Sequence, residues 1–516
     1  MLCLPERLRY NRHMRFKFYS TIGMFALCAL MPLAASAATS SSFEVSGWLP
    51  YWRAASSTAD AIAHITELTE VDPFVYSVGN DGSIIDNGPM DQAPWTTLIS
   101  VAKANHVRVI PTVMWSDPTS EEAILSSTRK RVALEVAIAN LVKENNYDGI
   151  DIDFEGKPAD LKDDFSTFLK GLYARMGTKL VTCDIEARTP LAAEYYGMTI
   201  PQGAGEYAND YTQINKYCDR VHLMTYDQQD VDAQLAAVAA SSSQLYAPVA
   251  DPAWVTAVVN LAKQSISPSK IDVGVPTYGY EYDVTAYANN EYNYDIMWTF
   301  DPGYATQIEQ EYSVTPTRNS ADELELTYLP SVGTSSLPVS SNINNALVAA
   351  AAASQYATQN NSHLDFRLLD WPDATAVADK AALAKSLGVR GIAIFKIDGG
   401  EDPNIWSAIA GLAQSSSGAG AQNGGSSGAL TRDLYLGVTG TDVATLQKIL
   451  NSDPSTQVAA SGAGSSGSET SIFGAATLKA VQKFQIKYGI AAPGNAGYGR
   501  VGPATRAKLN SILATL

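Results

Sequence analysis

Cysteine is scarce in this chain. The sequence contains four cysteines, and only Cys183 and Cys218 follow residue 37. Two cysteines cannot form the disulfide framework of a small cross-linked fold, so that class is excluded. They either form one bond or remain buried thiols, and we favour the thiols. The cysteines and the five histidines show no metal-ligand spacing, so we predict no metal and no cofactor.

Charged residues are also scarce, and basic ones are fewer than acidic ones. They make up 17% of the sequence, against ~25% in ordinary soluble domains, and the net charge is −17. A chain with this balance lacks the clustered Lys and Arg that bind phosphates, which argues against a nucleic-acid partner. Residues 430–516 differ, because they carry eight basic and four acidic groups. An acidic body joined to a cationic tail indicates two modules.

No apolar run is long enough to span a membrane, which takes about 20 residues. The nearest candidate is the uncharged stretch Thr21–Ala35, which follows five basic residues and ends in Ala35-Ser36-Ala37. This order is typical of a secretion signal, with an uncleaved anchor as the alternative. We therefore predict that residues 1–37 are a cleaved signal peptide, and that the mature protein is secreted and has no membrane segment.

Apolar residues are plentiful, at 46%, and they recur in short β-branched runs separated by helical patterns. Strands that alternate with helices form parallel sheets, and eight of them can close into a barrel. We therefore predict an α/β fold, a (βα)₈ TIM barrel, over residues 38–412. The predicted strands are Glu44–Pro50, Val71–Ser77, Val107–Met114, Gly149–Phe154, Leu180–Ile185, Arg220–Thr225, Lys270–Pro276 and Arg390–Phe395.

The connection between the seventh and eighth predicted strands is too long for a simple loop. We expect an inserted element over about residues 281–365, whose Tyr-rich start, Tyr280–Tyr294, suits a wall that contacts sugars; a packed subdomain is the alternative. Residues 413–429 lack charges and large apolar side chains, which predicts a flexible linker. Residues 430–516 then form a small all-α domain of three helices.

The clearest chemical signal is a row of acids at Asp151, Asp153 and Glu155. Alternating side chains on a strand share a face, so these carboxyls lie roughly 6.6 Å apart and climb toward the strand's C-terminal end. In a (βα)₈ barrel that end forms the active-site mouth. Adjacent buried acids repel one another, so a purely structural role is a poor explanation. A solvated acidic strand or a calcium site is the alternative.

The pattern Asp-x-x-Asp-x-Asp-x-Glu, from Asp148 to Glu155, resembles the signature of glycoside hydrolase family 18, the chitinase-like (βα)₈ enzymes. On the sixth strand, Met224-Thr225-Tyr226-Asp227 is similar to the family's Met-x-Tyr-Asp. The third strand lacks the Ser-x-Gly-Gly common in chitinases, and Phe395 stands where the family usually has Trp. The ending Tyr278-Gly279-Tyr280 and the modest insertion look more like the wall- and cortex-lytic branch of the family.

The resemblance implies a retaining hydrolase in which the substrate's own 2-acetamido oxygen is the nucleophile. Glu155 would be the general acid, and Asp153 would orient the acetamido N–H. Asp151 would share a proton with Asp153, and Tyr226 would donate to the acetamido carbonyl. The expected substrate-binding residues are Asp227, Met224, Trp48, Tyr278 and Phe395.

Two further polar residues are interpreted as structural. Asp148 faces away from the acidic row, and His222 shares the inner face of the barrel but lies deeper, where a packed histidine is expected.

The tail, residues 430–516, resembles a three-helix peptidoglycan-binding module through Asp442-Val443, Phe473-Gly474 and Phe484-Gln485. Both resemblances imply a monomeric, wall-associated hydrolase that cuts β-1,4 bonds after N-acetylglucosamine in peptidoglycan. Chitin or its oligosaccharides are the alternative substrate, and a non-catalytic wall-binding lectin is the alternative class of protein.

Overall fold

The computed structural model describes residues 43–228, 234–237, 245–288, 291–330, 346–410, 412, 430, 434–435, 441–462, 464–470, 473–492 and 497–513. The predicted signal peptide, residues 1–37, and the predicted linker, residues 413–429, lie outside them. Among the described residues, no helix is both long enough and apolar enough to span a membrane.

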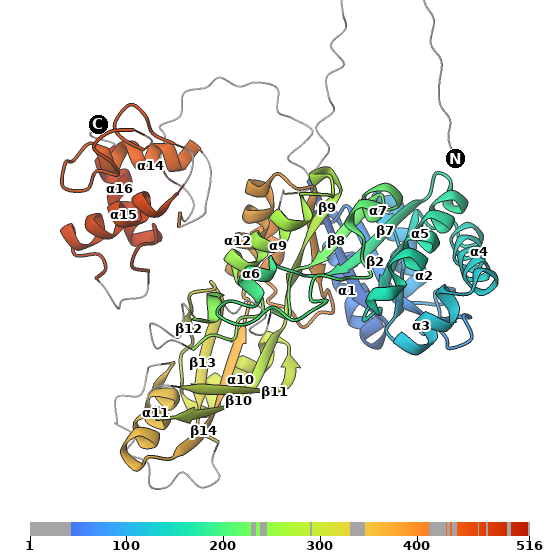
Figure 1. The fold of residues 1–516 in the computed structure, drawn as a ribbon, viewed down its shortest axis with the longest axis horizontal. Helices are drawn as coiled ribbons and strands as arrows, with labels where there is room; N and C mark the ends of the chain where they lie inside the picture. Colours follow the sequence, from blue (N-terminus) through green and yellow to red (C-terminus); the bar gives the residue numbers. More distant parts are fainter. Residues whose placement is uncertain are drawn as a thin grey trace, which may run out of the picture. The chain divides into compact units, whose positions relative to one another are not determined.

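Eight parallel strands close into a barrel (Figure 1). Neighbours around it follow the order β1-β15-β9-β8-β7-β6-β5-β2, and β1 pairs with β2 to close the circle. This confirms the predicted (βα)₈ fold. The strands are β1 (Glu44–Pro50), β2 (Glu70–Val78), β5 (Thr112–Trp115), β6 (Gly149–Phe154), β7 (Leu180–Glu186), β8 (Arg220–Met224), β9 (Ile271–Pro276) and β15 (Gly391–Phe395).

The third predicted strand is the one that differs. It was expected to run without a break over Val107–Met114, but the structure divides it into β4 (Arg108–Val109) and β5, separated by Ile110 and Pro111. Proline has no N–H to donate to a neighbouring strand, so the ladder is interrupted at Pro111. A short strand, β3 (Ile84–Asp86), adds an antiparallel edge to β2.

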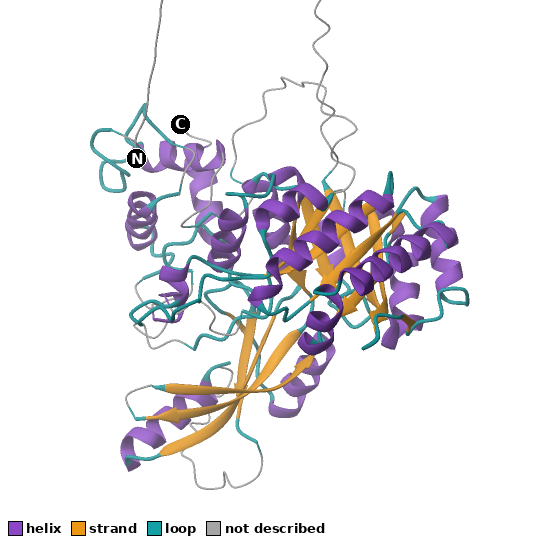
Figure 2. Cartoon of the chain, turned by 45° about the vertical axis from the view of Figure 1, so that its right-hand side comes forward, coloured by secondary structure: helices purple, strands orange, loops and turns teal. Residues whose placement is uncertain are grey.

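Helices cover the outside of the barrel (Figure 2). Their apolar sides pack on the outward side chains of the strands; Phe154 of β6, for example, stacks on Phe168 with ring centroids 5.3 Å apart. The helices of this part are α1 (Ala54–Ala63), α2 (Trp95–Ala104), α3 (Pro118–Leu125), α4 (Thr128–Glu144), α5 (Lys162–Met176), α6 (Leu191–Glu194), α7 (Tyr211–Tyr217), α9 (Pro252–Ala262), α12 (Ala374–Leu387) and α13 (Ile405–Ile409).

The insertion between β9 and β15 is a five-stranded antiparallel sheet with the order β11-β10-β14-β13-β12. It occupies residues 279–371, a wider span than the expected 281–365, because β10 begins soon after β9 ends. Figure 1 shows it projecting beside the barrel. Its elements are β10 (Gly279–Tyr287), β11 (Tyr292–Phe300), α10 (Pro302–Tyr312), β12 (Thr317–Arg318), β13 (Leu324–Tyr328), α11 (Val348–Asn360) and β14 (His363–Trp371).

Three helices lie near the C-terminus: α14 (Thr441–Asn451), α15 (Ala475–Lys487) and α16 (Pro503–Leu513). They enclose an apolar core of their own, as expected for a small all-α domain. Its buried members include Leu434, Val443, Leu446, Phe473, Val481 and Phe484.

Cys183 and Cys218 form a disulfide, so our preference for two free thiols is wrong. Cys183 lies on β7, and Cys218 is the residue at which α7 ends. The chain returns from α7 directly into β8, which pairs with β7, and this return brings the two residues together. Both are buried.

The bond closes a loop with a sequence separation of 35 residues. Cross-links of this kind typically stabilise by about 2–4 kcal/mol, so we expect the Cys183→Ala/Cys218→Ala double variant to lose that amount of unfolding free energy. Urea denaturation of the oxidised wild type and the double variant measures the difference. Reduced, unfolded and refolded wild type should match the variant. Equal midpoints for the variant and the oxidised wild type would contradict the expectation.

Candidate active site

A cavity of about 280 Å³ opens at the carboxyl ends of the barrel strands. Most side chains around it come from six of the eight strands or from the loops that follow them, and Trp254 comes from α9. Seven of the nine predicted site residues line it: Trp48, Asp153, Glu155, Met224, Tyr226, Asp227 and Phe395. The predicted strand positions are therefore brought to one place by the closure of the barrel.

The two remaining predicted residues lie directly beside the cavity. Asp151 sits beneath it with no exposed surface. Tyr278 lines an adjoining hollow of about 380 Å³ that shares Asp227 and Phe395 with the first. A third hollow, of about 820 Å³, in turn shares Phe300 and Asp301 with the second. Together they form a groove that leads from the barrel mouth along the inserted sheet.

The acidic row runs up the inner face of β6, as predicted. Asp151 and Asp153 are buried, whereas Glu155, just past the strand's end, is partly exposed to the cavity. Burial, followed by the charges of Glu155 and Asp151, raises the pKa of Asp153 well above its usual range.

Asp151 is held by donors from two other strands. Its Oδ2 accepts from the indole Nε1 of Trp48 at 3.0 Å and from the hydroxyl of Thr112 at 2.8 Å. Burial, followed by the nearby charge of Asp184, raises the pKa of Asp151 well above its usual range.

Burial raises the pKa of four acids at this site, Asp151, Asp153, Glu155 and Asp184. For Asp153 the effect is reinforced by the charges of Glu155 and Asp151, and for Asp184 by the charge of Asp153. Burial also raises the pKa of Glu155, which is the most exposed of the four. Carboxyls with raised pKa values can hold protons near neutral pH.

Aromatic rings form the floor and one wall of the cavity. The ring of Phe395 stacks on that of Tyr226 with centroids 5.3 Å apart, and Trp48 meets Phe395 edge-on at 5.7 Å. Asp227 adopts a positive φ of 57° and accepts hydrogen bonds from the hydroxyls of Tyr278 and Tyr280. These contacts fix a carboxylate beside the Tyr226 ring.

Several lining residues were missed by the sequence analysis. They are Phe74, Asp184, Glu186, Ala187 and Trp254. Asp184 and Glu186 alternate on β7 in the same way as the acids of β6, and this alternation was the available signal.

Asp148 and His222, which the sequence analysis interpreted as structural, do not line the cavity. Oδ2 of Asp148 accepts from the backbone N–H of Val109 at 2.9 Å, outside the cavity. His222 has no exposed surface and lies below the cavity, with its ring edge against Trp48.

Comparisons with known proteins agree with this architecture. The model of the family "Glycosyl hydrolases family 18" matches residues 51–400. The uncharacterized glycosylase YvbX of Bacillus subtilis is 23% identical over 161 residues, which are 31% of this chain and 42% of that protein. The match thus spans less than half of that relative's length.

Solved structures share the fold. The spore cortex-lytic enzyme SleL of Bacillus megaterium superposes with a TM-score of 0.52 at 20% identity, over 72% of this chain and 73% of that chain. A chitinase of Chromobacterium violaceum superposes with a TM-score of 0.51 at 17% identity, over 72% of this chain and 99% of that chain.

Gly274 of β9 creates the space that Tyr226 occupies. A Cβ atom there would lie 2.5 Å from the carbonyl oxygen of Leu223 and 2.8 Å from Cε1 of Tyr226. We expect Gly274→Ala to destabilise the chain by about 1–3 kcal/mol, as overpacked sites do, when measured by urea denaturation. Gly303→Ala is the matched control, because a Cβ there meets nothing within 4 Å. A neutral Gly274→Ala would contradict the assigned packing.

Proposed function

The chain belongs to glycosyl hydrolases family 18, and from this premise we propose that it cleaves β-1,4 bonds after N-acetylglucosamine in peptidoglycan, by a retaining, substrate-assisted mechanism. The observation that carries the proposal is the pair of adjacent carboxyls, Asp153 and Glu155, that line the cavity at the mouth of the barrel. A proton held there can be delivered to a glycosidic oxygen in the cavity.

Glu155 is the general acid in this mechanism. It is the acid nearest the open side of the cavity, and its raised pKa keeps the carboxyl protonated to higher pH than an exposed glutamate. As the leaving oxygen takes the proton, the acetamido oxygen of the sugar attacks the anomeric carbon and displaces the leaving group. Water then opens the cyclic intermediate, with Glu155 acting as the base.

Asp153 and Tyr226 handle the acetamido group. Asp153 accepts from its N–H and thereby increases the nucleophilicity of its oxygen, while the hydroxyl of Tyr226 donates to the same carbonyl oxygen. Burial raises the pKa of Tyr226 well above its usual range, so the hydroxyl keeps its proton. Asp151, anchored by Trp48 and Thr112, supplies a second carboxyl that can share a proton with Asp153.

The remaining predicted residues shape the sugar subsite. Phe395 and Trp48 provide an apolar floor, and Met224 packs beside them. Asp227, fixed by Tyr278 and Tyr280, offers a hydrogen-bond acceptor to a sugar hydroxyl. The groove beyond Tyr278 has room for further sugar units, which suits a polymeric substrate.

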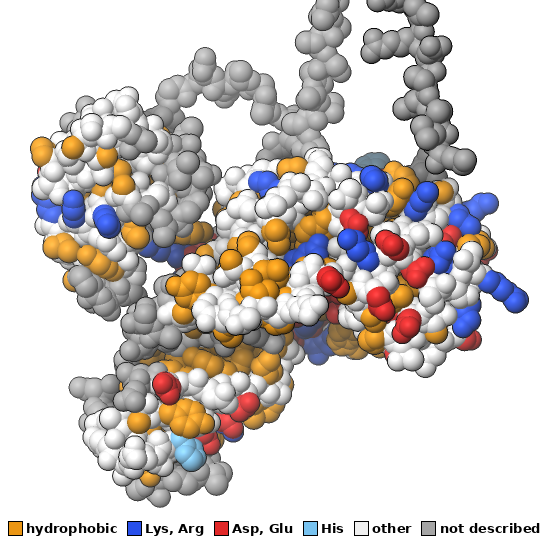
Figure 3. Space-filling view, viewed as in Figure 1, with side chains coloured by type: hydrophobic (Ala, Val, Ile, Leu, Met, Phe, Trp, Pro, Cys, Tyr) orange, Lys and Arg blue, Asp and Glu red, His pale blue; other side chains and the backbone are white. Residues whose placement is uncertain are grey.

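Peptidoglycan is proposed as the polymer for two reasons. One of the similar structures is a spore cortex-lytic enzyme, and the C-terminal domain resembles a peptidoglycan-binding module. On the face seen in Figure 3, the C-terminal helices present Lys and Arg side chains, which suit an anionic wall. The signal-like residues 1–37 support secretion to that wall, and we propose a monomer.

Chitin remains the second candidate substrate, because another similar structure is a chitinase. A non-catalytic lectin is disfavoured by the intact acidic row, which binding alone does not require.

We expect the wild-type chain to release fragments with reducing-end N-acetylglucosamine from purified peptidoglycan, as identified by mass spectrometry. Glu155→Gln should reduce the rate by about 10²–10⁴-fold, because an amide of the same shape cannot donate the proton. Sugar binding, measured by calorimetry with N-acetylglucosamine oligomers, should be retained in this variant.

Three outcomes separate the candidates. Digestion of chitin but not of peptidoglycan favours the second substrate, and no product from either polymer favours the lectin. If Glu155→Gln retains more than about a tenth of the wild-type rate, well above the range for a lost acid, then Glu155 is not the acid.

The pH profile offers an independent check on Glu155. Besides burial, the charges of Glu186 and Asp227 raise its pKa, whereas Lys157 and the hydrogen bond from Asp153 lower it. Glu186→Gln removes a negative charge, so the pKa of Glu155 falls and the alkaline limb of kcat/KM moves to lower pH. Lys157→Met removes a positive charge, so the limb moves to higher pH. Limbs that move in the same direction would contradict the assignment.

A further inference from the structure

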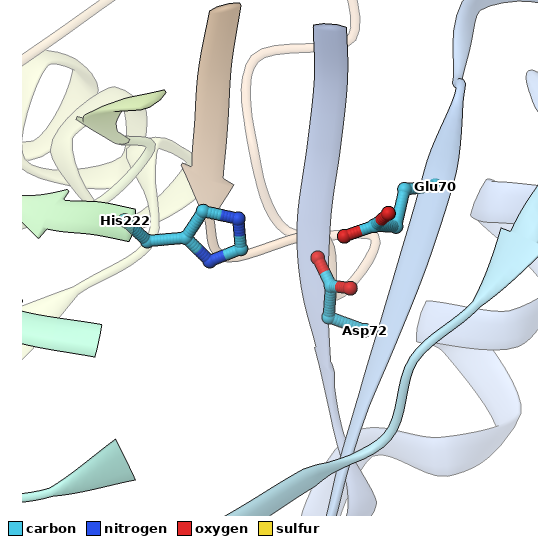
Figure 4. A group of neighbouring side chains, drawn as sticks. All are labelled: Glu70, Asp72 and His222. Carbon is cyan, nitrogen blue, oxygen red and sulfur yellow. The ribbon is translucent and has the colours of Figure 1, made fainter. Parts of the chain in front are cut away.

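The floor of the barrel holds a second group of titratable side chains, below the acidic row. Glu70 and Asp72 come from β2, His222 from β8 and Asp272 from β9. Figure 4 shows the imidazole of His222 facing the carboxyls of Glu70 and Asp72 across the barrel. One ligand atom each from Glu70, Asp72 and His222 lies within 4.8 Å of the others, and Nε2 of His222 is 3.9 Å from Oδ2 of Asp272.

All four side chains are fully buried, with no exposed surface. Neither oxygen of Asp72 nor of Asp272 has a hydrogen-bond partner among the described residues, and the same holds for Nε2 of His222 and Oε1 of Glu70. Buried polar atoms are normally satisfied, and each one left alone costs stability. These six buried atoms therefore need a partner that the described protein atoms do not supply.

Nearby arginines do not account for the whole cluster. Arg108, Arg220 and Arg390 bind Glu44, and Arg108 and Arg220 also approach Oε2 of Glu70, at 2.7 and 3.7 Å. In the part of the chain that the structure describes, no ion pair with Lys or Arg reaches Asp72 or Asp272.

His222 is already oriented as a metal ligand would be. Its Nδ1 lies 3.1 Å from Oδ1 of Asp184, and its Nε2 faces the cluster, 3.9 Å from Oδ2 of Asp272. Metal-binding histidines commonly donate their second nitrogen to a carboxylate in this way. Asp184 thus connects His222 to the cavity, which its own side chain lines.

We propose that Glu70, Asp72 and His222, with Asp272 beside them, bind one divalent first-row metal ion, of the Zn²⁺ or Mn²⁺ type. One imidazole nitrogen and several carboxylate oxygens suit such ions, whereas Mg²⁺ and Ca²⁺ prefer oxygen alone. Two ligand atoms that each lie about 2.0–2.2 Å from one ion are separated by no more than twice that distance. This is close to the 4.8 Å within which the ligand atoms of Glu70, Asp72 and His222 lie. The ion neutralises Asp72, and through His222 it holds Asp184, which lines the active-site cavity. The sequence analysis missed this group because its members show no local spacing.

The test is metal analysis of the full-length chain, purified without a metal-affinity step. We expect about one equivalent of Zn²⁺ or Mn²⁺ per chain by inductively coupled plasma mass spectrometry. A buried ion should survive dialysis against EDTA and be lost only after unfolding in guanidinium with EDTA. Protein refolded without metal should melt at a lower temperature, and refolding with Zn²⁺ or Mn²⁺ should restore the melting temperature.

Variants locate the ion. Asp72→Asn and His222→Gln should each fall to less than about a tenth of an equivalent, since removing one ligand weakens such sites strongly. Asp370→Asn is the matched control, because Asp370 is a buried carboxyl of the inserted sheet, and it should keep the full equivalent.

Two results overturn the proposal. The first is wild-type protein that holds less than about a tenth of an equivalent after refolding with either metal, and that melts at the same temperature as the metal-free protein. Protons, and not a metal ion, would then neutralise the cluster. The other is bound metal that persists in both ligand variants, which would place the ion elsewhere. Neither result depends on glycosidase activity, so the proposed function is tested separately.

Discussion

Closure of the barrel buries carboxyl groups in its interior, and much of the surrounding structure offsets the free-energy cost of burying them. On β6 every second residue from Asp151 to Glu155 faces inward, and the apolar residues between them pack on α5. Burial of charge without partners costs several kcal/mol. The acids therefore hold protons or accept from fixed donors. For Asp151 the donors are Thr112 on the neighbouring strand β5 and Trp48 on β1, a strand that does not pair with β6.

The same constraint explains the composition of the strands around β6. Gly274 on β9 admits the Tyr226 ring, and Tyr226 in turn stacks on Phe395, so that an apolar surface covers the inner acids. The low dielectric created by these rings raises the carboxyl pKa values, and a raised pKa is what an acid catalyst needs. The arrangement gives up stability at the barrel mouth in exchange for a proton donor, as active sites commonly do.

The sequence predicted those features that depend on local pattern. The bounds of β1 and β6 match because alternating or β-branched runs end at turns, and the row of acids stood out within one strand. Features that depend on pairing between distant segments were missed. Asp184 joins the site only because β7 lies beside β6, and Cys183 meets Cys218 only after α7 turns back. The break at Pro111 was readable but was overlooked within an apolar run.

The buried acids lie at two levels of the barrel, and the cost of burying their charge is offset differently at each level. The upper level, at Asp153 and Glu155, opens to the cavity, so protons and substrate can reach it. The lower level, around Asp72 and Asp272, is sealed by the barrel and can exchange its counter-ions only when the strands separate. Asp184 and His222 connect the two levels through adjacent positions on β7 and β8.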